Sequence, residues 1–179
     1  MTSRFRIALA ALLLLALTSA AQRPPDSWRD TFQRRLAMYG HRNWIVIADS
    51  AYPQQSGPGI ETVLSNESQI ATVRSVMAAV SRARHVRPVV YTDQELAFVP
   101  EGDAPGIGAY RQELSAVIAQ PTTVPHDEII RKLDEAGRSF NVLIIKTNMT
   151  LPYTSVFLEL RAAYWGDEAE DRLRKSMKH

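Results

Sequence analysis

Apolar residues recur along the chain with two different periods. An apolar residue at every third or fourth position is typical of an amphipathic helix, and this spacing covers the segments 28–39, 67–85, 110–119 and 126–138. Short continuous apolar runs are typical of buried strands, and the two clearest are 44–48 and 141–146. Weaker strand patterns cover 60–64, 88–92, 121–124 and 155–160, the first of which also fits a turn. Because strands alternate with helices, the sequence predicts an α/β fold.

Glycine, proline and charge mark the boundaries between these elements. Gly40 follows the first helical segment and is predicted to end it as a left-handed C-cap. Segments 52–59 and 97–109 are rich in Pro and Gly and are predicted to be loops. Residues 166–179 form a charged C-terminal tail with a helical pattern.

The first 21 residues have the order of a secretory signal peptide. Arg4 and Arg6 precede an apolar run over residues 7–17, and small residues including Ala20 and Ala21 follow it. The run is shorter than the about 20 residues that a membrane-spanning helix needs. We therefore expect cleavage after Ala20 or Ala21 and a periplasmic or secreted protein, with an uncleaved N-terminal anchor as the alternative. Residues 22–34 would then form a linker and the start of the first helix.

Composition narrows the class of partner. The 179 residues are 45% hydrophobic and 22% charged, which is typical of one globular domain, and no cysteine is available for a disulfide or a thiolate site. The chain has 21 Lys and Arg against 19 Asp and Glu, and removing residues 1–21 takes away two arginines and no acid. The mature chain is therefore balanced in charge. This balance argues against a nucleic-acid partner and, after cleavage, against a membrane partner.

Candidate chemistry is sparse. The four histidines form no HExxH or HxH pattern, and the chain has no P-loop, GxSxG or GxGxxG motif, so no metal or other cofactor is expected. Ligands of α/β proteins bind at the carboxyl ends of strands, which directs attention to Asp49 and to segment 146–155. His41 precedes the strand that ends at Asp49, and we expect the two side chains to converge on one pocket edge.

Each candidate also has a structural interpretation. His41 could be a surface loop residue and Asp49 a turn-forming aspartate. His126, which opens a helical segment, could simply be solvent-exposed, and Tyr153 could be a packed aromatic.

Three segments together resemble one family. Residues 40–53 (GHRNWIVIADSAYP) are similar to the GH-x-D-x-I-x-I-x-D-A-x-x-P signature of the D-ribose pyranase and L-fucose mutarotase (RbsD/FucU-like) family. Residues 124–129 (VPHDEI) resemble its H-E/D-E-F segment, and residues 146–155 (KTNMTLPYTS) resemble its R-T-G-E-x-x-P-Y-A-N motif. The resemblance covers residues 35–165. It implies a single RbsD-like domain with a central mixed sheet flanked by helices.

The resemblance also implies an activity and its residues. Members open and reclose a cyclic hemiacetal by general acid/base chemistry, which suits histidine because its pKa lies near 6.5, and they use no cofactor. It implies His41 as the catalytic residue and Asp49, His126, Tyr153 and Ser155 as substrate-binding residues. It further implies a homo-oligomer whose pocket is completed at a subunit interface.

We therefore expect an exported monosaccharide mutarotase or pyranase acting on a ribose-like or fucose-like sugar. The segment departs from the family motif at Lys146, Asn148, Met149 and Ser155. These departures favour the first alternative, a sugar-binding module of the same fold without turnover. A structural or scaffold protein is the second alternative.

Overall fold

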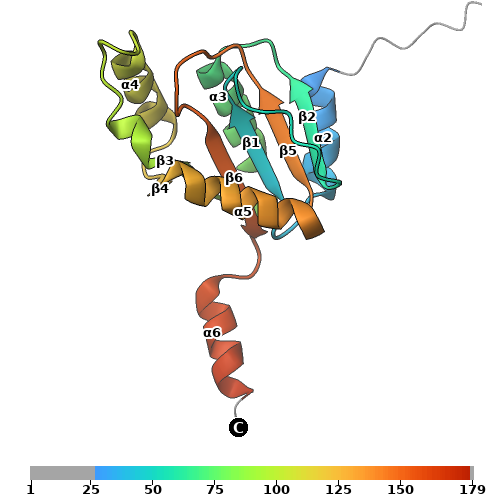
Figure 1. The fold of residues 1–179 in the computed structure, drawn as a ribbon. Coiled ribbons are helices and arrows are strands. Elements are labelled where there is room, and N and C mark those ends of the chain that lie inside the picture. Colours follow the sequence, from blue (N-terminus) through green and yellow to red (C-terminus); the bar gives the residue numbers. More distant parts are fainter. Residues whose placement is uncertain (1–26, 178–179) are drawn as a thin grey trace, which may run out of the picture.

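The computed structural model describes residues 27–177 and has an α/β fold with one mixed sheet (Figure 1). The strands are β1 (Trp44–Ala48), β2 (Ile60–Leu64), β3 (Val86–Asp93), β4 (Thr122–Val124), β5 (Val142–Lys146) and β6 (Val156–Ala162). The helices are α2 (Trp28–Met38), α3 (Gln69–Val80), α4 (Ile107–Val117), α5 (His126–Ser139) and α6 (Asp167–Ser176), with a 3₁₀ turn η1 (Gln94–Ala97). The predicted signal peptide lies outside the described residues.

The six strands lie in the order β2-β5-β1-β6-β3-β4. Strand β6 is antiparallel to both β1 and β3, whereas every other pair is parallel. The carboxyl ends of five strands therefore share one edge with the beginning of β6. We call this the carboxyl edge, and the edge where those five strands begin and β6 ends is the amino edge.

Helices cover both faces of the sheet. Every residue of β1 is buried, and successive side chains of a strand point to opposite faces. Ile45 and Ile47 belong to the core cluster that includes α2, α3 and α4, whereas Val46 packs in a second cluster with α5. Figure 1 shows α5 crossing one face of the sheet. This two-sided burial explains why β1 is a continuous apolar run.

The end of α2 corrects one expectation. The helix begins with a capping box between Ser27 and Asp30, and it ends at Met38. Tyr39 already has an extended backbone, while its N–H donates to the carbonyl of Arg35. Gly106 is the one described glycine with a positive φ, so the predicted left-handed cap at Gly40 is wrong. The helix ends one residue earlier, in a conformation that needs no glycine.

The last helix stands apart from the sheet. Helix α6 has no buried residue and extends below the body in Figure 1. None of the helices within residues 27–177 combines the length and apolar character that crossing a membrane requires.

Candidate functional site

The carboxyl edge brings Asp49 and Ser155 together. Asp49 follows β1 and Ser155 precedes β6, and the antiparallel pairing of Ile47 with Val156 places the two ends side by side. The hydroxyl of Ser155 donates to Oδ2 of Asp49 at 3.0 Å. Because Ser155 is almost fully buried, this bond fixes the half-buried carboxylate of Asp49 in place.

His126 lies at the same edge because β3 pairs with β4, the strand that precedes it. Asp93 ends β3 opposite Val124, and Pro125 then leads into α5, which begins at His126. Nδ1 of His126 lies 3.1 Å from Oδ1 of Asp93. The backbone N–H of His126 donates to the carboxylate of Glu95 at 3.0 and 3.1 Å. Two carboxylates therefore fix the position and the orientation of this histidine.

The carboxyl group of Asp93 is unusual because it is buried and only one of its two oxygens has a hydrogen-bond partner among the described residues. Its Oδ2 atom is buried without a hydrogen-bond partner among the described residues. Burial raises the pKa of Asp93, the contact with His126 opposes that rise, and the charges of Glu95 and Asp49 add to it. When Asp93 is ionised, Nδ1–H of His126 donates to it and Nε2 becomes the acceptor. No described group bonds this Nε2 atom, so it is available for proton transfer.

Tyr153 contributes a partly exposed ring beside His126. The two ring centroids are 5.6 Å apart in an edge-to-face arrangement. Tyr153 has a φ of 56°, a left-handed conformation that costs an L-residue about 1–2 kcal/mol. Such strain concentrates at functional sites, where the surrounding structure holds it.

A buried glutamine holds the strand ends that carry these residues. The Nε2 atom of Gln69 donates to the carbonyls of Ile47 and Thr154, both at 2.9 Å. Its Oε1 atom accepts from the hydroxyl of Thr147 at 2.6 Å. The hydroxyl of Tyr110 also donates to the carbonyl of Thr154 at 2.6 Å. The ends of β1 and β5 and the start of β6 are thereby tied to α3 and α4.

His41 lies elsewhere. It occupies the turn before β1, at the amino edge, where its Nε2 accepts from Nε of Arg42 at 3.2 Å. A strand rises about 3.3 Å per residue, so the five residues of β1 alone separate the turn that carries His41 from Asp49 by about 13 Å. The expected convergence of these two side chains on one pocket edge is therefore wrong within a single chain. The structure groups Asp49, His126, Tyr153 and Ser155 and leaves His41 apart.

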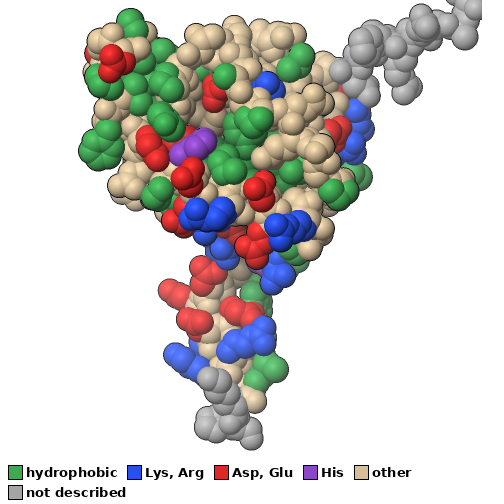
Figure 2. Space-filling view, in the orientation of Figure 1, with side chains coloured by type: hydrophobic (Ala, Val, Ile, Leu, Met, Phe, Trp, Pro, Cys, Tyr) green, Lys and Arg blue, Asp and Glu red, His purple; other side chains and the backbone are tan. Residues whose placement is uncertain are grey.

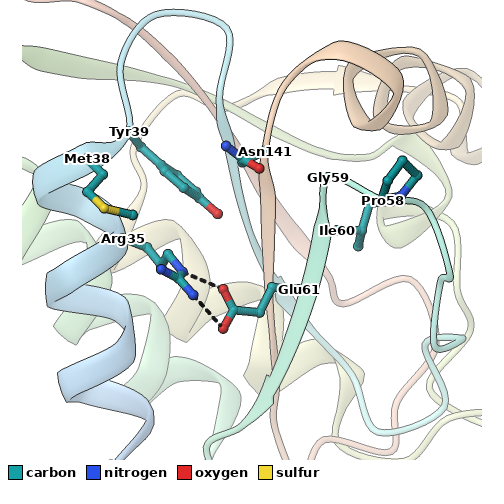
Figure 3. A pocket seen from close by; sticks show the side chains of 8 residues that line it. All are labelled: Arg35, Met38, Tyr39, Pro58, Gly59, Ile60, Glu61 and Asn141. Atoms are coloured by element: carbon teal, nitrogen blue, oxygen red, sulfur yellow. Dashed lines mark hydrogen bonds and ion pairs between the residues drawn. The ribbon is translucent and has the colours of Figure 1, made fainter.

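Two cavities lie at the amino edge. His41 lines one of about 510 Å³. The other, of about 390 Å³, is drawn in Figure 3, where Arg35 of α2 makes an ion pair with Glu61 of β2. The hydroxyl of Tyr39 points toward this pair, and burial raises its pKa to about 12. The second cavity contains none of the sequence-predicted site residues.

Sequence reasoning missed Asp93, Glu95 and Tyr52. Asp93 directly follows the predicted strand 88–92, so the rule that selected Asp49 at the end of its strand would have found it. The buried hydroxyl of Tyr52 has no hydrogen-bond partner among residues 27–177. Burial raises the pKa of Tyr52, and the charges of Asp134, Asp93 and Asp49 raise it further. Tyr52 therefore lies within electrostatic range of the site.

The face that carries α5 gathers acidic side chains around a histidine (Figure 2). Within the part of the chain that the structure describes, no group of three or more His, Cys, Asp or Glu residues is arranged to hold a metal ion. The arrangement offers one oriented histidine, carboxylates and hydroxyl groups, which suits hydrogen bonding and proton transfer.

Comparison with one solved structure shows the same fold, and two others are more distant similarities. RbsD of Bacillus subtilis, complexed with D-ribose, has a TM-score of 0.51 at 18% identity, covering 78% of this chain and 97% of that one. The fucose mutarotase of Streptococcus pneumoniae, in complex with L-fucose, has a TM-score of 0.47 at 18% identity, covering 72% and 89%. FucU of Bifidobacterium longum has a TM-score of 0.49 at 14% identity, covering 77% and 93%.

A search of curated proteins gives no match to the sequence. The model of one protein family, described as the RbsD / FucU transport protein family, matches residues 30–161. This range contains all five sequence-predicted site residues and the whole sheet except Ala162, the last residue of β6. The chain therefore belongs to the RbsD/FucU family.

Proposed function

We propose that the protein binds a monosaccharide at the carboxyl edge and interconverts its cyclic forms. The observation that carries this proposal is the pairing of His126 with the buried Asp93 close to the Asp49–Ser155 pair. Membership of the RbsD/FucU family and the ribose complex of B. subtilis RbsD support a sugar as the ligand. The sugar would be ribose-like or fucose-like.

The chemistry requires two proton transfers. Opening a cyclic hemiacetal removes the proton of the anomeric hydroxyl, breaks the bond between the anomeric carbon and the ring oxygen, and protonates that oxygen. Nε2 of His126 takes or gives one of these protons, while Asp93 stabilises the imidazolium that forms. Asp49 and Tyr153 hold sugar hydroxyls. Reclosure on the other face, or through another hydroxyl, reverses the steps.

His41 is proposed as a second acid/base group that a neighbouring copy supplies. The family resemblance implies a pocket completed between subunits, and His41 lies at the edge opposite the other candidates. A homo-oligomer in which the amino edge of one copy meets the carboxyl edge of the next would bring His41 to His126. Such a head-to-tail contact generates a closed ring where the rotation between copies closes.

Anomer exchange measured by saturation-transfer NMR tests the proposal. We expect exchange on ribose or fucose, and a loss of about 10²–10⁴-fold in both His126→Ala and His41→Ala. His85→Gln is the control, because within residues 27–177 the His85 ring hydrogen-bonds to the backbone carbonyls of Leu36 and Tyr39 and to no site residue. Wild-type exchange in His126→Ala would contradict the assignment.

Mixing the two inactive variants distinguishes a shared site from a site within one chain. In co-expressed oligomers of His41→Ala and His126→Ala, about a quarter of composite sites would contain both histidines, so activity should partly return. If both histidines acted within one chain, every chain would lack one of them and the mixture would stay inactive.

The competing function is a sugar-binding module without turnover, which the departures at Lys146, Asn148, Met149 and Ser155 favour. Isothermal titration showing sugar binding in a protein that exchanges no anomers would establish it.

We also propose export to the periplasm or the medium, supported by the residue order of segment 1–21. N-terminal sequencing from the native host should find a start near Gln22, and an intact Met1 would contradict export.

A further inference from the structure

The cavity beside His41 is built partly by a segment outside the family match. Its volume is about 510 Å³, within the range of about 300–1,000 Å³ that is typical of small-molecule sites. The body of the protein contributes His41, Arg42, Arg87 and Arg161, whereas the segment after β6 contributes Trp165 and Arg174. The match to the family ends at residue 161, so one wall of this cavity lies outside the matched range.

Four guanidinium groups line the cavity. Three of them lie near a carboxylate of the chain, each through one of their nitrogens. Nε of Arg161 lies 2.9 Å from Glu159, and Nε of Arg174 donates to Glu170 at 2.7 Å. Arg87 lies 3.5 Å from the largely exposed Asp167, a weak pair in water.

Arg42 has no carboxylate partner among residues 27–177, because its Nε donates to His41 and its guanidinium stacks on Phe140 at 5.6 Å. The terminal nitrogens of Arg42 and Arg174 are therefore donors that an incoming oxyanion can use, and the charge of Arg161 adds to the attraction.

One acidic side chain of the cavity, Glu170, is held in place by two hydrogen bonds. Glu170 accepts from Nε1 of Trp165 at 2.7 Å and from Nε of Arg174. These two bonds lower the pKa of Glu170 and keep it ionised. They also fix the indole of Trp165, which remains 45% exposed and presents a ring face beside the guanidinium groups. Tyr164, which is 80% exposed, adds a second aromatic ring.

We propose that this cavity binds a small ring compound that carries an oxyanion, namely a phosphorylated or carboxylated monosaccharide. The guanidinium groups would hold the oxyanion through paired N–H donors, which match phosphate and carboxylate oxygens. The fixed indole would contact the ring. The oxyanion part rests on the cavity alone, whereas the choice of a sugar as the ring rests on the proposed function.

Isothermal titration of the full chain with D-ribose 5-phosphate, D-glucuronate, D-ribose and inorganic phosphate tests this proposal. We expect one of the two charged sugars to bind at least about 10-fold more tightly than both ribose and phosphate, and to weaken as salt rises. Preference for ribose 5-phosphate would identify a phosphate ester, and preference for glucuronate a sugar acid. Equal binding of ribose and the charged sugars would overturn the proposal, and so would phosphate binding as tightly as the charged sugars.

Two variants test whether the charged sugar binds in this cavity. Arg42→Ala and Trp165→Ala should each weaken binding of the preferred charged sugar by about 10-fold, since each removes one partly exposed contact. Arg138→Ala removes the same charge from α5, outside this cavity, and should leave binding unchanged. Undiminished binding in both cavity variants, with circular dichroism showing a folded protein, would overturn the proposal.

In the proposed oligomer this cavity would border the shared site, because His41 belongs to both. The two outcomes can still be told apart. A protein that binds a charged sugar here but exchanges no anomers would contradict the mutarotase and retain this site. A protein that exchanges neutral anomers but shows no preference for charged sugars would support the mutarotase and contradict this site.

Discussion

Nδ1 of His126 lies 3.1 Å from Oδ1 of Asp93, although the two residues come from different elements. Asp93 is 2% exposed and has an unpartnered oxygen, so it carries a burial cost that no other contact offsets. A buried carboxylate that orients a partly exposed imidazole suits the general acid/base role that we propose for His126. In that role the pair would exchange stability for reactivity.

Replacing Asp93 by Asn should separate these two effects. Anomer exchange should fall at least about 10-fold, because an amide does not stabilise the imidazolium or fix its tautomer as a carboxylate does. The free energy of unfolding near neutral pH should be unchanged or higher, because the cost of a buried charge is removed. NMR exchange and urea denaturation measure the two quantities.

The raised pKa of Asp93 predicts that the free energy of unfolding depends on pH. Burial raises the pKa of Asp93 in the folded protein above its ordinary value of about 3.9, so the folded state holds this proton more tightly than the unfolded state. The contribution of Asp93 to stability is therefore greatest at low pH and is lost as pH rises through the raised pKa. Urea denaturation between about pH 4 and pH 7 should show the wild type losing stability relative to Asp93→Asn. The opposite trend would show that Asp93 is stabilised as an anion.

Ser155→Ala should weaken sugar binding. The hydroxyl of Ser155 donates to Asp49 at 3.0 Å, and a hydrogen bond to a charged group contributes about 1.5–3 kcal/mol, which corresponds to roughly 10-fold or more in affinity. Ser115→Ala, on the exposed side of α4, is the matched control. Isothermal titration with the sugar that shows exchange provides the measurement, and equal affinities for the two variants would remove Asp49 from the binding site.

Gly59→Ala should destabilise the fold by about 3 kcal/mol. A Cβ at Gly59 would lie 2.3 Å from the carbonyl oxygen of Phe140 and 2.9 Å from that of Gly137, so the start of β2 would have to move away from α5. Gly40→Ala is the control, since nothing lies within 4 Å of its Cβ position, and it should change stability by less than about 0.5 kcal/mol. Similar urea midpoints for the two variants would contradict the close packing.

Gln69→Ala should destabilise the protein by about 1–3 kcal/mol and reduce exchange as well. Its loss leaves the carbonyls of Ile47 and Thr154 without their donor in a buried site, and the carboxyl edge loses its link to α3. Gln33→Ala, on the exposed face of α2, should change neither quantity measurably. Thermal unfolding and NMR exchange together check this prediction, which would be wrong if the two glutamine variants behaved alike.

The order of helices and strands could be predicted from the sequence because it depends on local periodicity. The buried runs at 44–48 and 141–146 became β1 and β5, and the helical spacing of 126–138 became α5. The placement of two candidate residues at the carboxyl edge was predictable for a related reason. Asp49 and Ser155 were selected by strand-end position and family motif, and both rules refer to short stretches of chain.

Long-range pairing decided the rest. The sequence separates Asp93 from His126 by more than thirty residues, and only the parallel pairing of β3 with β4 brings them together. His41 is close to Asp49 in sequence, yet the fully extended β1 carries it to the opposite edge of the sheet. Likewise, only the exit of β6 at the amino edge places Trp165 beside His41. Local pattern determines which elements form, whereas the order and direction of the strands determine which side chains meet.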